Sequence, residues 1–145
     1  MWGYILAFIS GALMSIQGVF NSEVTKDTSI WISAGFVQFT ALIVCVIAWF
    51  VTGRESNVGA LLRFSPKYML LGGVMGAFIT YTVIQSVSSL GPARSVMFIL
   101  IAQLVIAFLI ESFGLFGVEK VDFEWRKIIG MAVIIVGIIT FKWSK

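Results

Sequence analysis

Two side-chain carboxamides, those of Gln17 and Asn21, lie within the first long apolar stretch of the chain. With Ser10 and Met14 they recur at spacings of four, three and four residues, which aligns all of them on one face of a helix. A carboxamide in lipid is costly unless it faces a hydrogen-bonding partner or water. The stripe therefore predicts either a site that binds a solute by hydrogen bonds or a contact with a neighbouring helix.

A later apolar stretch carries three further polar side chains, Arg94, Gln103 and Glu111. Glu111, near the end of the stretch, is either an interfacial carboxylate or a group in a water-filled cavity that can carry a proton or pair with a cation. Arg94 either extends to the lipid headgroups or binds an anionic solute. Gln103, like Gln17, could line a pathway or bind a neighbouring helix.

The residues needed for most enzyme chemistry are missing. The chain has no histidine and one cysteine, Cys45, so it cannot form an intramolecular disulfide or a Cys/His zinc site. We therefore expect no enzyme activity, no metal and no cofactor, and we expect Cys45 to be a structural thiol. The basic residues lie between apolar runs, where they would meet phospholipid headgroups, and nucleic acid is not an expected partner.

The elements that must position these side chains are transmembrane helices. The 145-residue chain is 59% hydrophobic and 12% charged, so its solvent is lipid. A helix needs about 20 apolar residues to cross a bilayer, and four such helices are plain, at about 2–21, 30–51, 68–88 and 93–112. Gly91 and Pro92 supply the turn between the last two. The first is expected to be a retained helix, since no basic residue precedes it as in a signal peptide.

A fifth helix is predicted at about 125–143. Its uncharged run, residues 128–141, is short for a span. However, Trp125 and Trp143 are 18 residues apart, about 27 Å along a helix, and could anchor it at both headgroup levels. Arg126, Lys127 and Lys142 would extend outward. The fold class expected is an all-α integral membrane protein with five transmembrane helices in a single domain, residues 1–145.

Close contacts between these helices are predicted where small residues repeat every three or four positions. One such seam lies on the first helix and another on the third; their members are Gly11, Ser15, Gly18 and Ser22, and Gly72, Gly73, Gly76 and Thr80.

Five spans place the two termini on opposite sides of the membrane. Six basic residues then lie on the N-terminal side and four on the other, a weak preference for a cytoplasmic N-terminus that could allow both orientations, or dual topology. The two sets are Arg54, Arg63, Lys67, Lys120, Arg126 and Lys127, and Lys26, Arg94, Lys142 and Lys145.

Three segments together resemble the bacterial YdcZ-type family of the drug/metabolite transporter superfamily: GALMSIQGVFN (residues 11–21), LGGVMGAFITYTVIQSVSSLGPA (71–93) and AQLVIAFLIESFGLFG (102–117). The pattern matched is Gln and Asn in the first helix, a glycine-rich third helix, and Gln, an acidic residue and an FGxFG-like end on the fourth. The chain departs from it at Glu111, where Asp is commoner, and at Arg94, where a small residue is more usual.

The resemblance implies a half-size transporter, because larger members of the superfamily have ten helices in two inverted five-helix repeats. Alternating access is commonly built from such inverted halves. We therefore expect an antiparallel homodimer, or a heterodimer with a related chain, that exports a small solute across the bacterial inner membrane, with proton coupling as an added possibility. Gln17, Asn21 and Gln103 would bind the solute, Glu111 is the candidate for proton coupling, and Arg94 is the candidate for contact with an anion. Two alternatives are a dual-topology ion channel and a non-transporting membrane accessory subunit.

Overall fold

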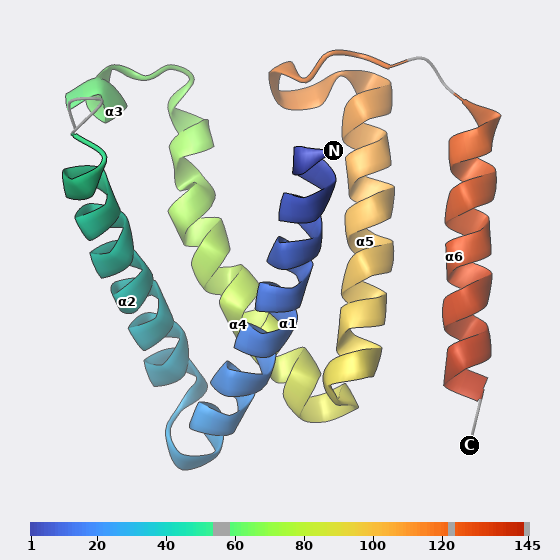
Figure 1. Ribbon diagram of the computed structural model, residues 1–145, viewed down its shortest axis with the longest axis horizontal. Helices are drawn as coiled ribbons and strands as arrows, with labels where there is room; N and C mark the ends of the chain where they lie inside the picture. The colour runs from blue at the N-terminus through green and yellow to red at the C-terminus, as the bar shows by residue number, and fades with distance from the viewer. Residues whose placement is uncertain (54–58, 122–123, 144–145) are drawn as a thin grey trace. The chain divides into compact units, whose positions relative to one another are not determined.

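The structure, a computed structural model, describes residues 1–53, 59–121 and 124–143, and every regular element in these ranges is helical (Figure 1). The chain divides into two compact units, Met1–Ser89 and Leu90–Lys145. The first contains α1 (Trp2–Asp27), α2 (Ile30–Val51), α3 (Gly59–Arg63), the 3₁₀ helix η1 (Lys67–Leu71) and α4 (Gly72–Leu90), whose last residue lies past the division. The second contains α5 (Pro92–Phe113), the 3₁₀ helix η2 (Leu115–Gly117) and α6 (Trp125–Trp143). Arg54 and Lys145, two of the basic residues counted above, lie outside the described residues.

Among the described residues, four helical segments are long and apolar enough to cross a membrane: α1, α2, the continuous η1–α4 segment Lys67–Leu90, and α5. The predicted all-helical membrane fold is thus confirmed. α6 is helical over its 19 residues but is not among the four. Because Arg126, Lys127 and Lys142 fall within it, its uncharged stretch is short, and a fifth span remains a prediction.

The first helix does not end at Asn21 as predicted but continues to Asp27. Interactions between polar side chains and the same helix contribute to the stability of these additional turns, which contain few apolar residues. The Thr25 hydroxyl donates to the carbonyl of Asn21 at 2.7 Å, and Lys26 pairs with Glu23 at 2.6 Å. The connection to α2 is therefore short, and the Ser29 hydroxyl caps α2 by accepting from the Ile32 amide at 3.2 Å.

The best-buried part of the first unit lies near this α1–α2 turn. The hydroxyls of Ser22 on α1 and Ser88 on α4 share a hydrogen bond of 2.9 Å. A Cβ added at Gly18 would lie 3.4 Å from Val83 of α4, so the glycine permits close approach. At Gly11 nothing lies within 4 Å of such an atom. The small-residue seam on α1 therefore contacts α4 in the C-terminal half of the helix.

α2 also contacts α4, through two side-chain pairs. The rings of Trp31 and Tyr81 stack with centroids 4.6 Å apart, and the Gln38 amide donates to the Thr80 hydroxyl at 3.4 Å. In Figure 1, α1 and α2 diverge as they leave the turn that joins them. The closest packing of the first unit thus lies near the turn, where its buried residues gather.

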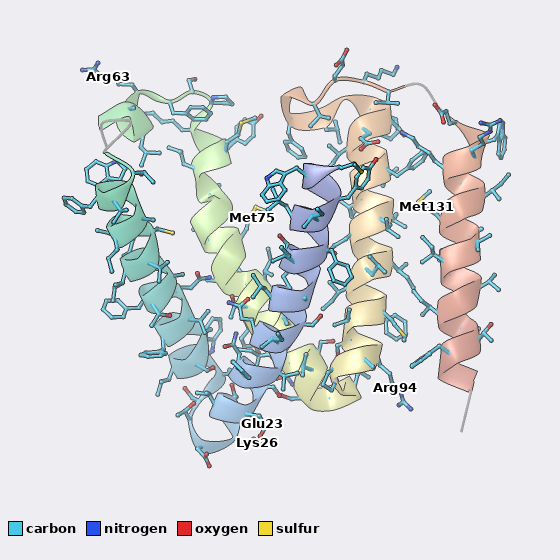
Figure 2. The ribbon with its side chains drawn as sticks, in the orientation of Figure 1. Glu23, Lys26, Arg63, Met75, Arg94 and Met131 are labelled. Atoms are coloured by element: carbon cyan, nitrogen blue, oxygen red, sulfur yellow. The ribbon has the colours of Figure 1, made fainter. Side chains whose placement is uncertain are left out.

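The second unit pairs α5 with α6 as antiparallel neighbours (Figure 1). α5 begins with Pro92, after Gly91 has taken a φ of 81° that favours glycine. It ends where Gly114 adopts the left-handed conformation and donates its amide to the carbonyl of Ile110. Met131 of α6 points toward α5 (Figure 2).

Candidate functional site

A groove of about 510 Å³ lies along α1 and α2 in the first unit. Its lining is mostly apolar, and the two carboxamides predicted from the sequence to share a helix face, Gln17 and Asn21, both belong to it. The other lining residues are Val24 of α1 and Ser33, Phe36, Val37, Thr40, Ala41, Val44 and Cys45 of α2.

Asn21 has unusual surroundings for a side chain in this groove. The residue is only 8% exposed. Its main-chain carbonyl accepts hydrogen bonds from the hydroxyls of Thr25 at 2.7 Å and Ser33 at 3.2 Å, while its carboxamide has no hydrogen-bond partner among the described residues. Among the described residues, no side-chain nitrogen or oxygen is both fully buried and without a hydrogen-bond partner. The unpaired carboxamide of Asn21 must therefore face open space. The groove is the open space that Asn21 lines.

The hydroxyl groups of the groove already have acceptors. Thr40 donates to the carbonyls of Phe36 and Val37, at 3.0 Å each, and Ser33 donates to that of Asn21. Gln17 is exposed, and its amide likewise has no partner among the described residues. Apart from the weak S–H donor of Cys45, the side-chain donors free to bind a solute among the described lining residues are therefore those of the two carboxamides.

None of the described residues that line the groove carries a carboxylate, an ammonium or a guanidinium group. The nearest charged residues along α1, Glu23 and Lys26, are exposed and paired with each other at the end of the helix (Figure 2). The groove runs beside the C-terminal half of α1 and beside residues 33–45 of α2, which begin after the first turn of that helix. The groove is thus close to electrically neutral.

Cys45 lies exposed on the groove wall. The expectation of a structural thiol rested on its apolar neighbours in sequence, which cannot distinguish a buried helix face from one that borders a groove. Thr40, Phe36 and the rest of the α2 lining were missed for the same reason, since α2 has no polar stripe to mark its groove face.

The remaining predicted site residues belong to the second unit. Gln103 is exposed on α5 and is not part of the groove lining. Arg94 is exposed near the start of α5, extends away from the helix (Figure 2), and has no ion-pair partner among the described residues.

Glu111 has a partner that the sequence analysis missed. One of its carboxylate oxygens lies 3.2 Å from the Lys127 ammonium of α6, and both side chains are partly exposed. We had expected Lys127 to extend toward the headgroups. A signal was available, because opposite charges at the facing ends of consecutive antiparallel helices can meet. The pair links the end of α5 to the start of α6.

Comparison with known proteins supports the resemblance drawn from the motifs. A search of curated proteins found no match, and a search of solved structures found none either. The sequence model of one family, described as "Putative inner membrane exporter, YdcZ", matches residues 2–140, nearly the whole chain. Exporters are not an enzyme class, and their substrates are small solutes. With its apolar helices long enough to span a membrane, this chain belongs to the YdcZ family of multi-pass inner-membrane exporters.

Proposed function

We propose that the groove between α1 and α2 is the solute site of this exporter, and that Gln17 and Asn21 bind the solute by hydrogen bonds. The observation that supports this most directly is Asn21, a residue more than nine-tenths buried whose carboxamide has no partner among the described residues. This carboxamide faces the groove, so a solute bound there can supply the hydrogen bond that the described residues do not. A helix-packing amide, such as Gln38 bound to Thr80, has its partner already.

We further propose that the chain works as an antiparallel dimer with alternating access. The spanning windows of α1 and α5 are only 6% and 0% buried, so most of their surface is available for packing against another copy or lipid. A second, inverted copy would close the groove and provide ten predicted helices around a central site. A heterodimer with a related chain would satisfy the same requirement.

Glu111 is the site we propose for proton coupling. Protonation of its carboxylate would leave the Lys127 ammonium 3.2 Å away without its counter-ion. The ion pair that joins α5 to α6 would then break when Glu111 takes up a proton. A group that couples transport to protons needs this kind of structural response. Gln103 remains a predicted contact for the solute, and Arg94 remains a candidate for contact with an anion.

Reconstitution of the purified protein into liposomes tests the proposal. We expect saturable, temperature-steep solute efflux from the wild type and a loss of at least tenfold in Asn21→Ala, with the dimer intact by cross-linking. Gln38→Ala is the matched control and should keep efflux, since its amide serves a helix contact. Equal losses in both variants, or efflux with the linear concentration dependence of a channel, would overturn the proposal.

A further inference from the structure

We infer that the groove selects electrically neutral amphiphiles, that is, molecules with an uncharged amide, urea or hydroxyl-type group attached to an aromatic or aliphatic body. This inference rests on the proposed function and specifies its substrate class. It follows from the polar groups of the groove, from its charge and from its size, each considered in turn.

The polar groups favour an uncharged partner that both donates and accepts. Each carboxamide offers two N–H donors and one carbonyl acceptor, and Gln17 and Asn21 lie one helical turn apart on the same wall. A neutral amide or urea can donate to one carboxamide and accept from the other. A carboxylate can only accept, and a quaternary ammonium can do neither.

Charge acts in the same direction. An ion that leaves water for this groove loses its hydration, and no lining residue supplies a counter-charge. Lys26 and Glu23 are exposed and already paired with each other. The groove therefore disfavours cations and anions alike, whereas a neutral polar group recovers its lost hydration through the two carboxamides.

The apolar remainder of the lining accounts for the rest of the solute. Phe36, Val37, Val44 and Val24 provide an apolar wall. Drug-sized ligands bind in sites of about 300–1,000 Å³, a range that includes the 510 Å³ of this groove. A ring or short acyl chain would lie against this wall while its polar group reaches Asn21.

The native thiol provides the test. Cys45 is the chain's single cysteine and lines the groove, so a bound solute should slow its alkylation by N-ethylmaleimide in the full-length protein in liposomes. The probes are N-phenylbenzamide and its para-trimethylammonio and para-carboxylate derivatives, which share one body and differ in charge. We expect the neutral amide to protect Cys45 at a concentration at least tenfold lower than either ion.

Two variants separate binding from partition into lipid. Protection by the neutral amide should fall at least fivefold in Asn21→Ala and at least twofold in Gln17→Ala, and should persist in Gln38→Ala. Equal or better protection by either ion, no protection by any probe, or unchanged protection in both groove variants would overturn the inference. Efflux is measured separately: if a charged solute is exported through a site sensitive to Asn21→Ala, the proposed function holds and the neutral class is wrong. If Cys45 is protected but no solute is exported, the proposed function fails instead.

Discussion

Gln17 and Asn21 occupy adjoining turns of α1, but their side chains have different access to water. Gln17 is exposed, whereas Asn21 is 8% exposed. Water can replace a solute at Gln17 more readily than at Asn21, so the two amides should contribute unequally to binding. The difference lies in burial rather than in residue type, and the helical spacing alone did not predict it.

Gln17→Ala should therefore have a moderate effect. One hydrogen bond contributes about 0.5–1.5 kcal/mol, so we expect the half-saturating solute concentration to rise roughly two- to tenfold, less than in Asn21→Ala. The concentration dependence of efflux from proteoliposomes measures this. If Gln17→Ala instead disperses the dimer, and binding is never separable from assembly, Gln17 is a packing amide.

Glu111→Gln should leave the protein folded and remove the dependence of transport on a pH gradient. Glutamine keeps the shape and can still accept a hydrogen bond from Lys127, while the titratable proton is gone. The pair is partly exposed, so its loss should lower stability by less than about 1 kcal/mol.

Glu23→Gln is the matched control for that experiment, because Glu23 is also a carboxylate paired with a lysine but lies on an exposed turn of α1. Solute accumulation is measured with and without a pH gradient in both variants. If Glu111→Gln still accumulates solute in response to the gradient, the Glu111–Lys127 pair is only a link between helices and any coupling resides elsewhere.

Between elements, the glycines of α1 and α4 differ in how close their neighbours lie. Gly18 faces Val83 and Val87 of α4, and Gly76 faces the Gln38 amide, which lies 3.2 Å from an added Cβ. Gly72 and Gly73 have nothing within 4 Å. The predicted seam on α4 is therefore a close contact at Gly76 within the first unit.

Gly18→Leu should separate α1 from α4 and destabilise the protein by about 1–3 kcal/mol, the usual cost of overpacking. Gly76→Leu should act in the same direction by displacing Gln38 from Thr80. Gly11→Leu is the control, because nothing within 4 Å opposes a side chain there. Thermal unfolding in detergent compares the three, and an equal loss of stability at Gly11 and Gly18 would show that the α1–α4 contact is not the cause.

Hydropathy predicted the helices well because lipid imposes the same requirement on every span. Hydropathy predicted that α1 ends at Asn21, whereas the helix continues to Asp27. The last turns contain polar side chains such as Thr25 and Lys26, which bond to residues on the same helix and do not raise the hydropathy of the segment. The i, i+4 spacing correctly put Gln17 and Asn21 on one face. Which helix lies opposite them depends on tertiary packing, and a single sequence does not reveal it.

For the whole molecule, the open question is how the apolar surface of one chain is covered. Little of the surface of the described helices is buried within the chain, and only a few residues, such as Ser33, Ala34 and Ile84, are buried. Lipid alone could cover an apolar helix, but it cannot satisfy a carboxamide in an open groove. A second copy over the groove would exclude lipid from Asn21 and leave room for a solute.

The antiparallel form of that assembly requires that the chain insert both ways. Six basic residues against four is a small bias over short connections, so a label at residue 145 should be accessible from both sides of the membrane. Adding two lysines in the polar segment 22–29 would equalise the count, and adding more should lock one orientation and reduce transport. Co-expression of two variants locked in opposite orientations should restore it. Labelling from one side only, or full activity of a single locked variant, would exclude the self-complementary dimer and leave a heterodimer or a parallel assembly.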